Sequence, residues 1–214
     1  GKSFGYPKSV AGEVVFNTGM TGYQEVLTDP SYADQIVCMT YPLVGNYGVN
    51  LADDQSDKIQ VRGFIVKEAA SDPNHWQMDN RLADTLTKAN IAGIKGIDTR
   101  ALTRHIREYG VLKGVITCDL TSLDRLKQEL EDWQSEAKIV PTVSTTESYA
   151  LYAMPSERET GEGYHVVAMD FGIKKNILDA MQKKGFNITV VPYDTSAQEI
   201  LALNPDGIFL SNGP

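Results

Sequence analysis

The pattern of hydrophobic and polar positions predicts a strand-rich first part of the chain. β-Branched and aromatic residues gather in four segments and indicate strands over Glu13–Phe16, Gln35–Tyr41, Ile59–Lys67 and Val111–Cys118. In the third segment, apolar residues occupy both alternating sets of positions. This predicts a strand that is buried on both faces or ends in the core. Turns rich in Gly, Pro, Asn and Asp separate the strands, one of them at residues 28–31.

Three helices are expected in the same part. The first spans about Asn80 to Lys88. The second has Asp98 as its N-cap and ends at Gly110, with one apolar face formed by Leu102, Ile106 and Tyr109. The third follows Thr121 or Ser122, and its apolar stripe consists of Leu123, Leu126, Leu130 and Trp133. Stripes of this kind are nearly always core, so we expect both to be buried.

The last part of the chain alternates strands and helices. Strands are predicted over His165–Asp170, Asn187–Val191 and Ile208–Leu210. Ile173–Lys184 reads as a helix that Gly185 ends, and Ser196–Glu199 is a capping box that opens a helix reaching Leu203. This alternation predicts βαβ crossovers and a parallel sheet.

A polar stretch separates the two parts. Residues 141–163 are rich in Ser, Thr and Glu, although Tyr149 and Leu151 indicate that some of the stretch packs against a domain. We therefore predict an α/β protein with a β-rich domain over residues 1–140, a linker over 141–163 and a second α/β domain over 164–214.

Composition and charge exclude several classes of function. With 20 basic and 28 acidic residues the chain carries a net charge of −8, which disfavours nucleic-acid binding. No apolar run is long enough to span a membrane, and the first residues lack the hydrophobic region of a signal peptide. We expect a cytoplasmic protein whose first residue, which is not Met, follows a clipped or absent segment. Cys38 and Cys118 lie in apolar, strand-like stretches, so buried, reduced, structural thiols are expected, although a disulfide between them is possible.

The generic sites of α/β proteins find little support in the residues. The turn after the strand that ends at Asp170 contains only Gly172, whereas a dinucleotide site or a phosphate-binding loop needs several glycines. Asp170 lacks the acidic neighbours of a phosphoacceptor site. Asp53, Asp54 and Asp57 form an acidic loop without the calcium signature, and the three histidines show no metal-ligand spacing, so no metal site is predicted.

Several motifs are nevertheless specific. Residues 14–32, which read VVFNTGMTGYQEVLTDPSY, strongly resemble the N-terminal domain of the carbamoyl-phosphate synthase small-subunit family, as do Thr40-Tyr41-Pro42 and residues 96–104. The segments 170–178 and 204–214 resemble the opening of that family's class I glutamine amidotransferase domain. The resemblance covers nearly the whole chain and is most specific around residues 21–31.

The resemblance implies a β-rich, swivelling-type N-terminal domain followed by a flavodoxin-like amidotransferase domain. It implies hydrolysis of L-glutamine to glutamate and ammonia, and transfer of the ammonia to a large synthetase subunit. That partner makes carbamoyl phosphate from bicarbonate and ATP, for arginine and pyrimidine synthesis. No cofactor is implied for this subunit; ATP and Mg²⁺ or K⁺ are expected on the large subunit.

By the same resemblance, Ser31 and Gly213 match positions that contact glutamine. Ser31 lies on an Asp-Pro turn, where a hydroxyl can meet an amino acid, although a simple capping role is the alternative. Gly213 follows a predicted parallel strand, where a residue without Cβ lets backbone amides face an oxyanion; a plain turn is the alternative.

In the family pattern, the nucleophilic Cys and its His-Glu pair lie beyond Pro214. We therefore expect no catalytic residue, and no glutaminase activity, within the 214 residues. Two other interpretations stay open. One is a non-catalytic docking protein or degenerate amidotransferase, which a Ser or Ala in place of that Cys would favour. The weaker one is a flavin carrier, which would need a Ser/Thr-rich phosphate loop after the first strand of the last part.

Overall fold

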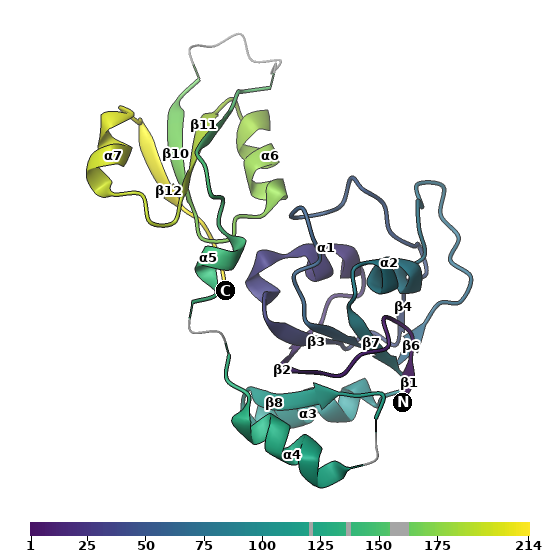
Figure 1. The fold of residues 1–214 in the computed structure, drawn as a ribbon. Coiled ribbons are helices and arrows are strands. Elements are labelled where there is room, and N and C mark those ends of the chain that lie inside the picture. Colours follow the sequence, from purple (N-terminus) through teal and green to yellow (C-terminus); the bar gives the residue numbers. More distant parts are fainter. Residues whose placement is uncertain (120–121, 136–137, 155–162) are drawn as a thin grey trace. The chain divides into compact units, whose positions relative to one another are not determined.

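The computed structural model describes residues 1–119, 122–135, 138–154 and 163–214 (Figure 1). Its contacts divide the chain into two compact units, residues 1–137 and residues 138–214, and each is described by itself. Among the described residues, no helix combines the length and the apolar character needed to cross a bilayer.

The first unit is built from short elements. In chain order they are β1 (Lys2–Ser3), β2 (Val10–Asn17), α1 (Tyr23–Thr28), the 3₁₀ helix η1 (Pro30–Tyr32), β3 (Gln35–Met39), β4 (Leu43–Val44), β5 (Gly63–Ile65), β6 (Glu68–Ala69), α2 (Leu82–Lys88), β7 (Ala92–Lys95), α3 (Thr99–Tyr109), β8 (Leu112–Ile116) and α4 (Leu123–Asp132).

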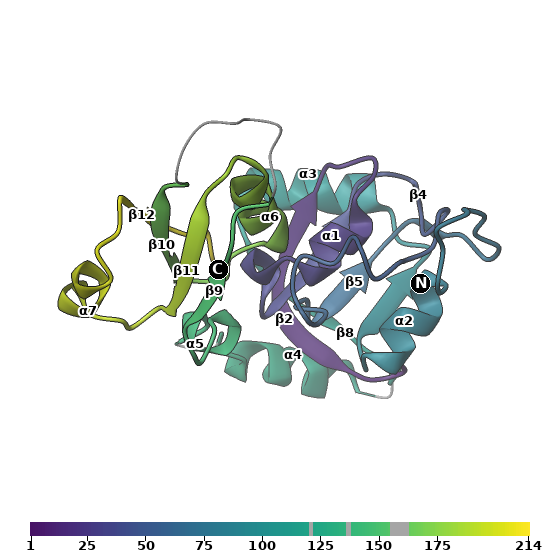
Figure 2. The same ribbon diagram turned by 90° about the horizontal axis from the view of Figure 1, so that it is seen from above.

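Six of these strands form one mixed sheet in the order β1-β7-β5-β3-β2-β8. The four inner strands run parallel, whereas β1 and β8 pair antiparallel at the edges. Along β3, Val37 and Met39 face a core cluster shared with α1 and α2, while Ile36 and Cys38 face a second cluster shared with α3. Figure 2 looks down on the face that carries α1 and α2. The predicted α/β class is confirmed.

The second unit contains α5 (Val140–Val143), β9 (Tyr149–Leu151), β10 (His165–Asp170), α6 (Lys175–Lys183), β11 (Asn187–Pro192), α7 (Ala197–Ala202) and β12 (Gly207–Leu210). Its sheet has the order β12-β10-β11-β9, and the first three strands are parallel, as predicted. Leu178 of α6 packs on one face of the sheet, and Ile200 of α7 packs on the other.

Local signals located many of the elements well. β10 has the predicted bounds, Gly185 has the left-handed φ of 89°, and the capping box of Ser196 and Glu199 is present. The Asp98 side chain caps α3 by accepting the Ala101 N–H at 2.9 Å.

The strand predicted over Ile59–Lys67 is shorter than expected, because only Gly63–Ile65 pairs in the sheet. The residues before it bond elsewhere: the Gln60 N–H donates to the Leu27 carbonyl at the end of α1. Within β5, Phe64 belongs to one core cluster and Ile65 to the other, so burial on both faces is confirmed.

The prediction that both apolar stripes are buried is wrong in part. On α3, Ile106 is buried, but Tyr109 is exposed and lies beside the His105 ring at a centroid distance of 4.6 Å. No residue of α4 is fully buried, and Leu123 is 64% exposed. The reason is that α4 lies along β8, at the edge of the sheet, where little of the core is within reach.

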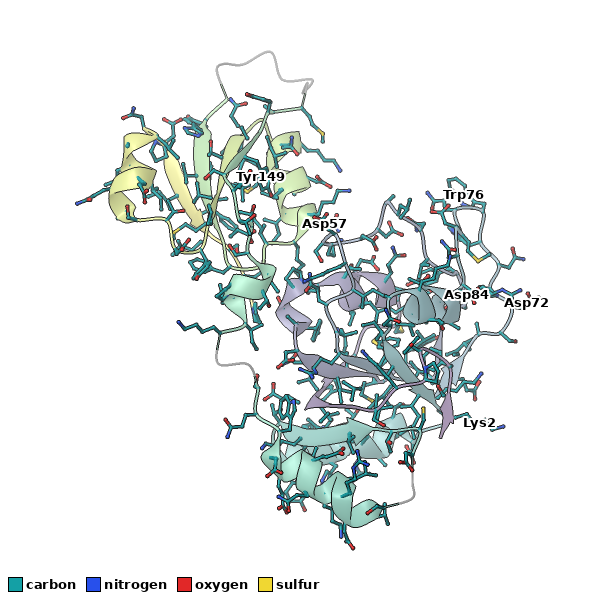
Figure 3. All side chains as sticks on the ribbon, in the orientation of Figure 1. Lys2, Asp57, Asp72, Trp76, Asp84 and Tyr149 are labelled. Carbon is teal, nitrogen blue, oxygen red and sulfur yellow. The ribbon has the colours of Figure 1, made fainter. Side chains whose placement is uncertain are left out.

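Part of the polar stretch 141–163 belongs to the second sheet. β9 pairs antiparallel with β11, with Tyr149 opposite Val190. Figure 3 labels Tyr149. The propensity of Tyr149 and Leu151 for strands indicated such packing. The domain limits taken from the sequence stay a prediction.

A buried leucine and an exposed leucine test this description of the first unit. Leu86 of α2 is fully buried, so Leu86→Ala should lower the free energy of unfolding by about 2–5 kcal/mol. Leu123→Ala, also within a helix, should change it by less than about 0.5 kcal/mol. Urea unfolding of both variants measures the difference. Equal losses would contradict the burial assigned to α2 and α4.

Candidate functional site

The two predicted site residues lie in different units: Ser31 in the first and Gly213 in the second.

The segment that leads to Ser31 begins where β2 ends. The Asn17 Oδ1 accepts the Gly19 N–H at 2.7 Å, and its Nδ2 donates to the Tyr32 hydroxyl at 2.9 Å. The Asn17 carbonyl also accepts the Thr40 N–H, which follows β3. The backbone and the side chain of this one residue thus tie the carboxyl ends of two parallel strands to η1, beside Ser31.

Ser31 itself lies in η1 and is half-buried. Asp29 is the N-cap of this helix, and its Oδ1 accepts the Ser31 N–H at 2.9 Å. Pro30, whose φ suits the first position of a helix, precedes Ser31. Asp29 uses the Ser31 N–H, whereas the Ser31 side chain ends in a hydroxyl, a group that can both donate and accept.

Helix α1, which precedes η1, is hydrogen-bonded through polar side chains to the loop before β5. Gln24 is buried, and its amide donates to Asp54 Oδ1 at 2.6 Å and accepts the Asn50 N–H at 2.9 Å. The Thr28 hydroxyl accepts the Gln55 N–H at 2.9 Å. Sequence reasoning expected only the turn at residues 28–31 and missed α1, because the partners of Gln24 and Thr28 are distant in the chain.

Two stacked tyrosines pack at the N-terminus of α1. The Tyr47 hydroxyl accepts the Gly22 N–H at 2.7 Å, and its ring stacks on Tyr23 at a centroid distance of 4.3 Å. Burial, and then the proximity of Tyr47, raises the pKa of Tyr23 far above its usual range. Both phenols therefore stay neutral and act as structural hydrogen-bonding groups.

Acidic residues of the loop before β5 lie close to Glu25 of α1. Burial, and then the carboxylates of Asp53 and Asp54, raises the pKa of Glu25. Across the described ranges, no three His, Cys, Asp or Glu side chains form a group that could hold a metal ion. A cavity of about 380 Å³ lies between α1 and α2 and includes Asp54 and Asp57 in its lining; Ser31 does not line it.

Gly213 lies where two parallel strands end side by side. Met169 of β10 pairs with Leu210 of β12, and the Ser211 N–H continues this ladder to the Met169 carbonyl at 3.2 Å. A Cβ at residue 213 would clash with the Phe171 carbonyl oxygen and lie 2.9 Å from its carbon. The Gly213 φ is not in the left-handed region, so space, and not backbone conformation, requires glycine here.

Asp170 organises the neighbouring turn. It is buried, and its Oδ1 accepts the N–H groups of Gly172 and Ile173 at 2.9 and 2.8 Å. Its Oδ2 accepts the Thr145 N–H at 2.7 Å. A carboxylate that binds three backbone amides is a structural clamp. Sequence reasoning weighed Asp170 as a phosphoacceptor, although an Asp after a strand, with Gly172 two residues later, also indicates such a turn.

The two cysteines differ. Cys38 is buried as predicted, and burial raises the pKa of its thiol to about 11. The prediction that Cys118 is also buried is wrong: it is exposed, two residues beyond the end of β8. Its apolar neighbours belong to the strand, and the chain leaves the sheet before reaching it.

Comparisons with known proteins give a consistent result. The family model "Carbamoyl-phosphate synthase small chain, CPSase domain" matches residues 1–116, and "Glutamine amidotransferase class-I" matches residues 167–214. Ser31 falls within the first match and Gly213 within the second.

Individual relatives align with the whole chain. It is 52% identical to a carbamoyl phosphate synthase small chain of Clostridium perfringens over 214 residues, covering 100% of this chain and 59% of the relative. It is 48% identical to that of Syntrophotalea carbinolica, with coverages of 100% and 59%. A pyrimidine-specific small chain of Halalkalibacterium halodurans is 47% identical, with coverages of 100% and 57%. The chain thus spans less than two thirds of the length of these relatives.

The thiols provide a direct test. With a pKa of about 11, roughly one Cys38 thiol in a thousand is ionised at pH 8, and alkylation requires the thiolate. Iodoacetamide should therefore modify Cys118 in the native protein while Cys38 stays intact, as read by peptide mass spectrometry. In urea both should react, and the Cys118→Ser variant should show no native labelling. Comparable native rates at the two sites would refute the assignment.

Two glycines of the second unit form a matched pair. Gly213→Ala places a methyl group against the Phe171 backbone and should displace residues 171–173 or 211–213. Gly207→Ala, at the start of β12, would meet only the Val166 Cγ2 at 4.0 Å and should be tolerated. Backbone amide chemical shifts measure both effects. Unchanged shifts in Gly213→Ala would rule out the close approach.

Proposed function

Because the chain belongs to the family of carbamoyl-phosphate synthase small chains, we propose that the protein hydrolyses L-glutamine to glutamate and ammonia and delivers the ammonia to a large synthetase subunit. The observation that carries this proposal is the order of the two family matches along one chain. The second alone is a general amidotransferase match. The preceding small-chain domain is what points to carbamoyl phosphate.

The large subunit would combine the ammonia with bicarbonate and ATP, and would hold the ATP and its Mg²⁺ or K⁺. The small chain itself would need no cofactor, because hydrolysis of an amide by a thiol requires only a nucleophile, a base and an oxyanion donor. A cytoplasmic location stays a prediction.

Ser31 and Gly213 would contact the glutamine. A hydroxyl can both donate to and accept from the polar groups of an amino acid. The capping of η1 by Asp29 supports a binding role for Ser31, since it holds the residue at a defined position. For Gly213, the supporting feature is the close approach of its backbone to Phe171 just beyond a parallel strand, a common place for ligand binding in α/β sheets.

Neither cysteine within the 214 residues suits the nucleophile. Cys38 is buried between the sheet and α3, where its raised pKa keeps it protonated. Cys118 follows β8 in the small-chain domain, outside the amidotransferase match. The reactive thiol would therefore come from residues outside those given, and the 214 residues alone would not hydrolyse glutamine.

The experiment uses a full-length small chain assembled with the large subunit. Ser31→Ala should raise the KM for glutamine by about tenfold, which corresponds to the loss of one hydrogen bond of about 1.4 kcal/mol. Ser9→Ala, at an exposed serine bonded to Thr117, is the control and should leave glutamine kinetics unchanged. The release of ammonia from glutamine is the measurement.

Two outcomes would contradict the proposal. A wild-type assembly that releases no ammonia from glutamine would favour the docking function instead. An unchanged KM in Ser31→Ala would remove Ser31 from the glutamine site while leaving the hydrolytic activity standing.

A further inference from the structure

We infer that Asp170 and Ser211 are positioning residues that hold the backbone of Gly213 in place for glutamine. The inference rests on the proposed function, because it concerns the same site. It adds two side chains that act on that site through the 171–173 turn.

The first contact joins the turn to the segment after β12. The Ser211 hydroxyl accepts the Phe171 N–H at 2.9 Å and donates to the Asn212 carbonyl at 2.7 Å. This one oxygen therefore bridges the loops that follow β10 and β12. Without it, a half-buried N–H and a carbonyl would both lose a partner.

The second contact supports the first. Asn212 Nδ2 lies 3.4 Å from the Gly172 carbonyl, and Gly213 packs directly on the Phe171 carbonyl. Each of the residues 211–213 thus contacts the 171–173 turn. The position of the Gly213 amide is set by where that turn is.

Asp170 fixes the 171–173 turn. Its carboxylate binds Gly172 and Ile173 on one side and Thr145, from the segment between α5 and β9, on the other. Gly172 has a φ of 115° in this turn, a conformation that glycine adopts more easily than other residues. Bonds from backbone N–H groups to a carboxylate are stronger than neutral ones, so these three bonds hold the turn firmly.

Such stiffness matters to the chemistry. Backbone donors assist a reaction only if they are preorganised before charge develops on the substrate. A displacement of about 1 Å in a positioning group can lower activity about 100-fold. Asp170 and Ser211 would not touch the substrate; they would keep the Gly213 amide from drifting.

The test measures glutamine kinetics in the full-length small chain assembled with the large subunit. Ser211→Ala and Asp170→Asn should each lower kcat/KM for glutamine about tenfold or more. Ser211→Thr retains the hydroxyl and should stay within about threefold of wild type. Synthesis from added ammonia bypasses the glutamine site and should keep its wild-type rate in every variant.

Two controls remove a side chain–backbone bond elsewhere in the same unit. Asp206 Oδ2 accepts the His165 N–H at 2.7 Å, at the opposite end of β10, and Ser196 caps α7. Asp206→Asn and Ser196→Ala should lower the melting temperature without changing kcat/KM. This separates loss of positioning from loss of stability.

The outcomes are distinguishable. If Ser211→Ala and Asp170→Asn behave like the controls while the wild type hydrolyses glutamine, the inference is overturned and the proposed function stands. If the wild type releases no ammonia, the proposed function fails, and the inference fails with it. If Asp170→Asn does not fold, the comparison of Ser211→Ala with Ser211→Thr decides.

Discussion

The structure depends on one constraint: backbone groups that leave a strand or helix inside the fold must still find hydrogen-bond partners. In this chain, polar side chains supply them at the ends of the parallel strands. Asn17 does so after β2, and Asp170 does so after β10. The segments next to Ser31 and Gly213 are held by these bonds in addition to the packing of Tyr32 and Ile173 on the two cores. Replacing Asn17 or Asp170 would therefore disturb the site more than the core.

Elements that depend on local chemistry could be predicted from the sequence. The cap at Asp98, the capping box at Ser196 and the apolar strand ending at Asp170 each act within a few residues. Features that depend on distant partners could not be predicted in the same way. Helix α1 is held by bonds from Gln24 and Thr28 to a loop about 25 residues further along the chain. Because these partners are distant, the local sequence did not predict the helix.

Burial was the other property that periodicity could not settle. The stripe on α4 has the spacing of a core helix, yet its position at the sheet edge leaves Leu123 exposed. Cys118 follows an apolar strand but lies past its last paired residue. For the site, the resemblance supplied Ser31 and Gly213, whereas the clamp formed by Asp170 emerged only when its three N–H donors were seen together.

The strand β9 has a consequence for how the protein behaves in solution. By lying antiparallel on β11, it shields one border of the second sheet. The other border, β12, has no strand beside it among the described residues, and its Ile208 and Leu210 are 51% and 63% exposed. Among the described residues the sheet therefore has two edge strands, β9 and β12, and β12 adds exposed apolar side chains to its unpaired backbone groups. An exposed edge that is also apolar is the kind of strand that pairs with another chain, so β12, rather than the covered β11, is where a further strand would add to this sheet.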